Sequence, residues 1–193
     1  MKRYLAAAAV AALALSACKQ PVTSISNNQT QGQTDEAPVD NSLTATGNMG
    51  TEATASADMA YVQNAATSDM FEIQTSQLAL EKAAMPSIKT YAQMMIDEHG
   101  KSSAELKAAA GQAGIPAPAA LPADKQAKVN ALRSLSGAEF DRLYLAEQRA
   151  GHQDTLAKVN TYLAAAPAGP LKDHASKLTG VVQKHLNSLE KIK

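Results

Sequence analysis

Three histidines occur on helix faces that the sequence predicts to be apolar, and these residues are the best suited to chemistry. His99, His152 and His185 each recur among Met, Leu and Val residues at helical spacing. An imidazole in a helical core is costly unless it is hydrogen-bonded or bound to a metal. Because His99 and His152 lie near the midpoints of their predicted helices, we expect the buried polar residues to meet in one central layer.

Two further polar residues accompany the histidines. In the first predicted helix, Asp69 lies on the buried face and Glu72 lies at the margin of that face. Tyr144 lies about two turns before His152 on the same predicted helix. The candidate polar-core or metal-binding residues are therefore Glu72, His99, Tyr144, His152 and His185.

This layer has two main interpretations. Neutral imidazoles from three helices, with the Glu72 carboxylate from a fourth, would suit a transition metal such as zinc, iron or copper. Alternatively, the layer is a hydrogen-bond network without a ligand, in which the histidines pair with Glu72, Tyr144 or Gln148 and fix the helix register. A small-molecule pocket is a third option. No cofactor other than a transition metal is predicted.

Several other kinds of site are disfavoured. The di-iron bundle enzymes use Glu-x-x-His on two helices, and this motif occurs nowhere in the chain. No nucleophile elbow, phosphate-binding loop or Cys/His zinc spacing is present either. His174 falls near the start of its helix, where we expect a partly exposed position at the edge of the core. Methionine is an adaptable core residue, so we interpret the following four as core packing rather than copper ligands: Met70, Met85, Met94 and Met95.

The elements that must position these residues are helices. Apolar residues recur at three- and four-residue steps from Asp58 onward, which predicts long helices over about 58–84, 86–111, 136–166 and 170–192. A capping-box pair, Ser136 and Glu139, marks the start of the third. The predicted apolar face of the first helix consists of Met59, Val62, Ala66, Met70, Ile73, Gln77, Leu80 and Ala84.

The connections between these helices predict the fold. Pro86 and the run Pro167-Ala168-Gly169-Pro170 mark tight first and third connections. The second connection, 112–136, is long and contains a short helix over about 123–135. No strand is predicted. We therefore expect an all-α domain over 58–193 with the ferritin-like arrangement of four helices and one crossover.

The beginning of the chain predicts export and a lipid anchor. Lys2 and Arg3 precede a short apolar run, which predicts a signal peptide over 1–17. The run ends in Leu15-Ser16-Ala17-Cys18, which resembles the lipobox of bacterial lipoproteins, in which the cysteine is acylated. Residues 18–57 are polar and poor in large apolar side chains, so we expect a disordered tether. By resemblance to lipoprotein sorting rules, Lys19 favours the outer membrane, with the domain facing the periplasm.

The charge balance excludes one class of partner. Without residues 1–17 the chain has 16 basic and 18 acidic residues, a net charge of −2, and no basic cluster. Nucleic-acid binding is therefore not expected. The predicted partners are the membrane, through the lipid anchor, and a protein or small molecule that the sequence does not name.

A resemblance to a known family rests on particular residues. The pattern Phe140-Asp141-x-x-Tyr144 followed by His152, together with Asp97-Glu98-His99 and His185-Leu186, resembles the bacterial domain of unknown function 4142. Its members are exported proteins placed with ferritin-like bundles. The resemblance covers about 58–190 and implies a bundle with inward histidines, but it implies no activity.

Taken together, the sequence predicts a lipid-anchored envelope protein, a binding or stress-related accessory protein rather than an enzyme. The first alternative is a metal-binding bundle that uses His99, His152, His185 and Glu72. The second is a redox or hydrolytic enzyme that uses Tyr144 and His152. Burial of neutral histidines should lower their pKa values, so we expect acid to destabilise the domain.

Overall fold

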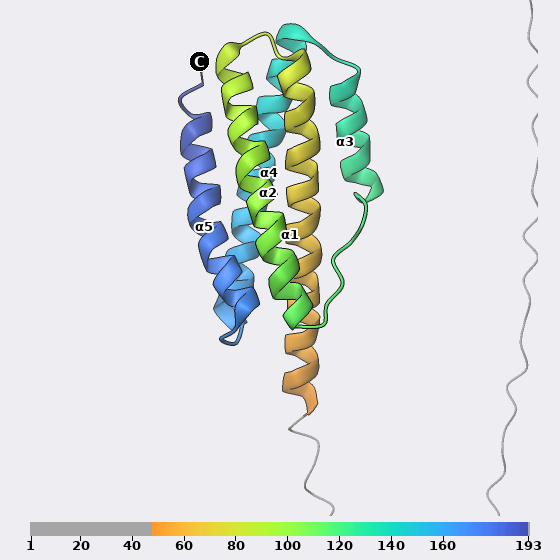
Figure 1. The fold of residues 1–193 in the computed structure, drawn as a ribbon, viewed down its shortest axis with the longest axis vertical. Coiled ribbons are helices and arrows are strands. Elements are labelled where there is room, and N and C mark those ends of the chain that lie inside the picture. The colour runs from red at the N-terminus through yellow and green to blue at the C-terminus, as the bar shows by residue number, and fades with distance from the viewer. Residues whose placement is uncertain (1–47, 193) are drawn as a thin grey trace, which may run out of the picture. The chain divides into compact units, whose positions relative to one another are not determined.

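The computed structural model describes residues 48–192. The predicted signal peptide 1–17, Cys18 and the predicted tether as far as residue 47 lie outside the described residues. Within 48–192 there are five helices and no strand (Figure 1). Their bounds are α1 Asn48–Lys82, α2 Pro86–Gln112, α3 Ala123–Arg133, α4 Gly137–Ala165 and α5 Pro170–Leu189. The predicted all-α class is confirmed.

The four long helices pack side by side. α1 contacts α2 and α4, and α5 contacts the same two helices from the other side. The short helix α3 belongs to the long connection between α2 and α4 and packs on α1 and α4 (Figure 1). The tight first and third connections and the long second one are as predicted. None of the described helices is both long enough and apolar enough to span a bilayer.

The first helix begins earlier than the sequence analysis predicted. α1 starts at Asn48, ten residues before Asp58, so 48–57 is helical rather than part of a disordered tether. This segment projects beyond the end of the other helices (Figure 1). Extending an existing helix costs far less than nucleating one, and the segment is rich in alanine, the strongest helix former.

The predicted buried face of α1 is also partly wrong. Val62 and Ala66 are buried, but Met59 is 50% exposed, and Gln77 and Ala84 are exposed as well. In their place α1 buries five polar residues: Ser68, Asp69, Glu72, Thr75 and Ser76. Their side chains make hydrogen bonds, several of them to other helices, which removes the penalty of burial. Apolar periodicity could not identify a face whose buried residues are polar.

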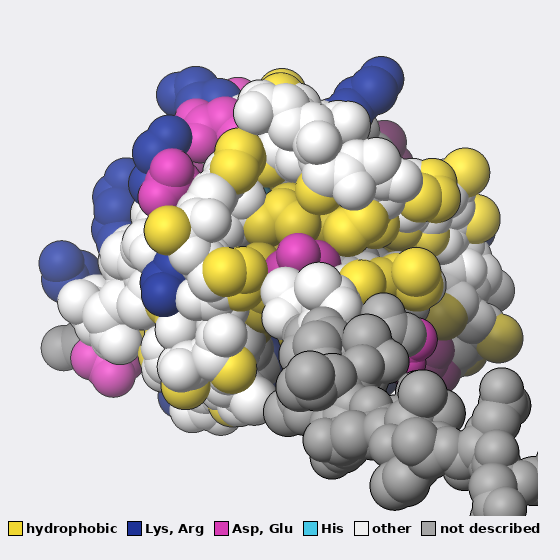
Figure 2. Space-filling view, turned by 90° about the horizontal axis from the view of Figure 1, so that it is seen from below, with side chains coloured by type: hydrophobic (Ala, Val, Ile, Leu, Met, Phe, Trp, Pro, Cys, Tyr) yellow, Lys and Arg dark blue, Asp and Glu magenta, His cyan; other side chains and the backbone are white. Residues whose placement is uncertain are grey.

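Two apolar clusters lie at opposite ends of the domain, with the polar layer between them. One is built around Tyr61, Leu106, Tyr162 and Leu171, and hydrophobic side chains are visible near the middle of that end (Figure 2). The other cluster includes Ile88, Met95, Phe140, Tyr144 and Leu189, with Met85 and Met94 packed against it. Met85, Met94 and Met95 are core residues, as predicted, whereas Met70 is partly exposed and belongs to neither cluster.

The start of α4 is held in a different way from the one predicted. Ser136 is the residue before α4, but its side chain makes no capping hydrogen bond. The buried carboxylate of Asp141 instead accepts hydrogen bonds from the backbone N–H groups of Ala84 and Met85, each at 3.1 Å. These groups belong to the α1–α2 connection, so Asp141 joins that turn to α4. This contact gives the Phe-Asp-x-x-Tyr run a structural role.

Candidate metal centre

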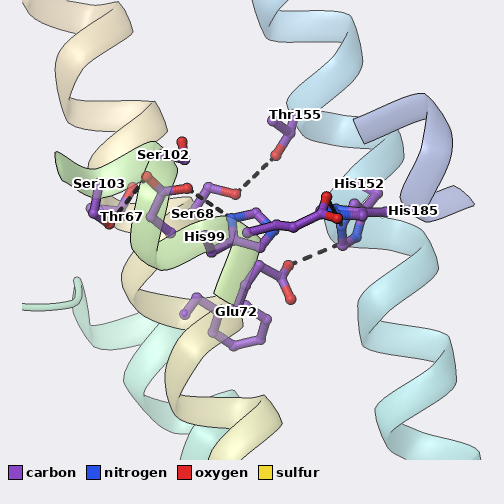
Figure 3. A network of polar contacts seen from close by, with 12 residues as sticks. Thr67, Ser68, Glu72, His99, Ser102, Ser103, His152, Thr155 and His185 are labelled. Atoms are coloured by element: carbon purple, nitrogen blue, oxygen red, sulfur yellow. Dashed lines mark hydrogen bonds and ion pairs between the residues drawn. The ribbon is translucent and has the colours of Figure 1, made fainter. Parts of the chain in front are cut away.

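Three histidines converge in the middle of the domain. His99 comes from α2, His152 from α4 and His185 from α5, and one ring nitrogen of each lies within 4.8 Å of the other two (Figure 3). All three residues are buried, with exposed fractions of 2%, 2% and 0%. The prediction that these residues share one layer is confirmed.

Asp69 determines the orientation of His99. The Nδ1 atom of His99 lies 2.7 Å from Oδ1 of Asp69, and Ser103 donates to the other carboxylate oxygen at 3.2 Å. Because a carboxylate only accepts, Nδ1 carries a proton, and Nε2 has a lone pair whenever the ring is neutral. This Nε2 atom is buried and has no hydrogen-bond partner within residues 51–192.

His152 is oriented by its own helix. Its Nδ1 atom lies 2.6 Å from the backbone oxygen of Gln148, one turn earlier in α4. A carbonyl oxygen also only accepts, so Nδ1 is the donor and Nε2 of the neutral ring holds a lone pair. That Nε2 atom lies 3.0 Å from Nδ1 of His185.

His185 is oriented by a carboxylate at the edge of the cluster. Its Nε2 atom lies 2.8 Å from Oε2 of Glu98, whose other oxygen accepts from Lys184. Nδ1 of His185 and Nε2 of His152 are within hydrogen-bond distance of each other. While both rings are neutral and donate their outer N–H groups, neither of these two nitrogens carries a proton. One nitrogen of each ring lies within 4.8 Å of the other two, and Nε2 of His152 and Nδ1 of His185 are the closest pair. Because Asp69 occupies Nδ1 of His99, we assign Nε2 as the nitrogen that His99 contributes.

This arrangement matches the requirements of a metal site. Metal-binding histidines donate their outer N–H to a carboxylate or a backbone carbonyl, which fixes the tautomer, and all three rings do so here. Zinc binds imidazole nitrogen at about 2.0–2.1 Å, which separates tetrahedral ligands by about 3.3 Å. The inward nitrogens are already 3.0 Å apart in one pair and within 4.8 Å throughout, so small side-chain adjustments suffice.

The surroundings of the cluster shift the pKa values of the three histidines in different directions. Burial by itself lowers the pKa of His99, but the hydrogen bond and charge of Asp69, with the charges of Glu72 and Glu98, outweigh it and raise that pKa. Burial, together with the charge on His99, lowers the pKa of His152 to about 3 and that of His185 to about 4. The predicted lowering is therefore correct for these two residues and wrong for His99, because Asp69 faces it from α1.

Glu72 lies beside the three histidines rather than among them. Its Oε1 atom is 3.9 Å from Nδ1 of His152, on the outer side of that ring, and its Oε2 atom accepts from the side chain of Gln148. Burial raises the pKa of Glu72 to about 7, against the lowering effects of His99 and Gln148. A Cβ atom at position 151 would lie 3.0 Å from Oε1, so Gly151 makes room for this carboxylate.

Tyr144 does not take part in the cluster. It is fully buried in the apolar cluster around Phe140, and its hydroxyl group lies 2.8 Å from Oγ of Ser76. The predicted network paired the histidines with Glu72, Tyr144 or Gln148. This is correct for His152, which contacts the Gln148 backbone and has Glu72 at 3.9 Å, and wrong for Tyr144. The partners are Asp69 for His99, the Gln148 backbone for His152 and Glu98 for His185. The sequence contained signals for two of these partners, because Asp69 lies on the buried face of the first helix and Glu98 directly precedes His99.

The fourth histidine lies in a separate polar contact. His174 is 5% exposed, so the prediction of a partly exposed position is wrong. The hydroxyl group of Tyr61 donates to its Nδ1 atom at 2.6 Å, and its Nε2 atom donates to the backbone oxygen of Ser102 at 3.2 Å. Tyr61 of α1 and the α2 backbone cover this ring, and both of its nitrogens have partners.

Comparison with protein families decides the relationship of this chain. The family model described as "Domain of unknown function (DUF4142)" matches residues 43–192. The chain belongs to the DUF4142 family. The family resemblance drawn from the sequence is thereby confirmed. A search of curated protein sequences finds no match to this DUF4142 chain.

Two solved structures of DUF305 proteins share the fold. A DUF305 fragment from Deinococcus radiodurans is 16% identical, with a TM-score of 0.62 over 70% of this chain and 94% of that chain. A candidate secreted DUF305 protein from Streptomyces coelicolor is 11% identical, with a TM-score of 0.59 over 69% of this chain and 88% of that chain. Similarity at these identities concerns the fold alone.

Proposed function

We propose that this DUF4142 protein binds a divalent first-row transition metal through His99, His152 and His185. The supporting observation is that each ring donates its outer N–H to an acceptor, so three basic nitrogens face one another. In a purely structural network, Nε2 of His99 would be a buried group without a partner, which costs about 1–3 kcal/mol. A bound cation satisfies all three nitrogens at once.

The three imidazole ligands limit which metals the site can bind. Imidazole nitrogens suit zinc, copper, iron and nickel, and three protein ligands with a fourth position left open are typical of zinc. Because the three histidines are at most 2% exposed, the centre suits holding an ion better than converting a large substrate. We therefore favour a metal-binding accessory protein over a redox or hydrolytic enzyme.

The proposal includes a place in the cell and a finer description of the fold. The four long helices, with α3 inside the one long connection, correspond to a ferritin-like bundle. The pattern Leu15-Ser16-Ala17-Cys18 supports a lipid anchor after a signal peptide over 1–17. The secreted character of the Streptomyces coelicolor neighbour is consistent with an envelope location. On this basis the domain faces the periplasm from the outer membrane.

Metal analysis tests the proposal directly. The chain is purified without chelators or an affinity tag and dialysed against zinc, and bound metal is measured per chain. We expect about one zinc per chain, and less than about 0.1 would contradict the proposal. The variant His185→Ala should lose the metal, and it should still fold because its partner Glu98 keeps its ion pair with Lys184. The matched control is His174→Ala, which removes a buried histidine outside the cluster.

A further inference from the structure

The three histidines are enclosed, so an ion needs a route to them. A groove of about 600 Å³ lies between α2 and α5. Glu98, Glu105, His174, Lys177, Gly180 and Lys184 are among the residues that line it. The groove therefore combines carboxylates that can bind a cation with lysines that compete for them.

Glu98 connects this groove to the cluster. One of its carboxylate oxygens accepts from His185 at 2.8 Å, and the other accepts from Lys184. The side chain of Glu98 is 21% exposed, whereas that of His185 is fully buried. Glu98 thus contacts the solvent-accessible groove with one oxygen and a cluster histidine with the other.

Two ion pairs cross the groove from α2 to α5. Lys184 pairs with Glu98, and Lys177 pairs with Glu105 at 3.1 Å. The two glutamates are about two turns apart on α2, and so are the two lysines on α5. Both lysine side chains are more than half exposed, so their pairs with the carboxylates are weak and easily exchanged.

We propose that this groove is the access route of the metal ion and that the Lys184–Glu98 ion pair closes the route, so this pair (the latch) must break before an ion can pass. A divalent ion displaces the Lys184 ammonium from Glu98, and then passes from the Glu98 carboxylate to the inward nitrogens of the histidines. At equal distance a divalent ion interacts twice as strongly with a carboxylate as an ammonium does. The inference rests on the proposed metal site and adds how that site is loaded.

Two glycines allow the route to be blocked with a matched control. Gly180 lines the groove on α5, and a Cβ atom added there would meet no atom within 4 Å. Gly100 is a helical glycine of α2 with the same free space, and it does not line this groove. Both residues are exposed and an added Cβ atom meets nothing at either, so a larger side chain can be introduced at both positions, and only that of Gly180→Phe lies in the groove.

The test measures how fast Co²⁺ enters the full chain, by the visible absorption of the bound ion in a stopped-flow instrument. We expect Gly180→Phe to slow loading about tenfold relative to Gly100→Phe, with equal Kd values for Co²⁺. Lys184→Gln should speed loading about threefold. The control Lys158→Gln, which breaks an exposed ion pair on α4 outside the groove, should leave the rate unchanged.

The possible failures can be distinguished. If the unsubstituted chain takes up no Co²⁺, the metal site is wrong and its access route with it. If the unsubstituted chain binds Co²⁺ but Gly180→Phe and Gly100→Phe load at the same rate, the route alone is wrong. If Gly180→Phe is slow and Lys184→Gln loads no faster than Lys158→Gln, the groove is the route but the latch is overturned.

Discussion

Two buried histidines, His174 and His99, differ in the number of hydrogen-bond partners that their ring nitrogens have. His174 has a partner on each ring nitrogen, the hydroxyl group of Tyr61 and the backbone oxygen of Ser102. His99 is buried to a similar extent, yet its Nε2 atom has no partner in the described part of the chain. Burial therefore does not distinguish a histidine whose ring nitrogens are both hydrogen-bonded from one with an unpartnered nitrogen, whereas an inventory of donors and acceptors does.

Zinc should stabilise the protein through the cluster, and this is the largest effect we expect. A ligand that binds only the native state at 1,000 times its Kd adds about 4 kcal/mol to the free energy of unfolding. Chemical unfolding with and without zinc should show this gain in the unsubstituted chain and in His174→Ala. His185→Ala should show none, and an equal gain in that variant would place the zinc elsewhere.

Asp141 tests whether a buried group that only holds the fold affects stability without affecting zinc binding. The substitution Asp141→Ala leaves the backbone N–H groups of Ala84 and Met85 without their acceptor, which should cost about 3 kcal/mol. The affinity for zinc should not change. Asp154→Ala is the control, because it breaks only an exposed ion pair and should cost less than about 1 kcal/mol. A weakened zinc affinity in Asp141→Ala would contradict the structural role.

Acid should destabilise the metal-free protein. The folded pKa values of His152 and His185, about 3 and 4, lie below the ordinary value, so the unfolded state binds more protons once the pH falls below about 6.5. His99 has a raised pKa and acts in the opposite direction, since its contribution is complete below about 6.5 and is lost as the pH rises through its folded pKa. His174 also has a lowered pKa, whereas Glu72, with a folded pKa raised to about 7, takes up a proton in the folded state and opposes the loss. With three lowered histidines against His99 and Glu72, we expect a net loss of about 1–2 kcal/mol between pH 7 and pH 5. A thermal midpoint that is equal at both pH values would contradict this expectation.

The smallest effect should come from the His174 contact. Tyr61→Phe removes the hydroxyl group that donates to His174 and should cost about 1 kcal/mol of unfolding free energy. Zinc binding should be unchanged, because His99, His152 and His185 keep their partners. Tyr162→Phe is a useful control, since the Tyr162 hydroxyl donates to Asp58 in a partly exposed contact instead. A loss of zinc affinity in Tyr61→Phe would show that the two histidine environments are coupled.

Local spacing in the sequence predicted much of the fold. The apolar faces of α2 and α5 follow from residues three and four apart, such as Ile88, Tyr91, Ala92 and Met95. The same face of α2 contains His99, so its burial could also be predicted. The face of α1 could not, since its buried residues include Ser68, Thr75 and Ser76, which no apolar pattern selects.

What the sequence by itself determined is therefore the set of helices and the place of three histidines on their apolar faces, because both follow from the spacing of residues close in the chain. The tertiary structure alone decided which ring nitrogen of each histidine faces inward. That choice depends on Asp69 of α1 for His99 and on Glu98 of α2 for His185. Whether a partner on another helix comes within hydrogen-bond distance depends on the rotation and axial offset of the packed helices, which local spacing does not encode.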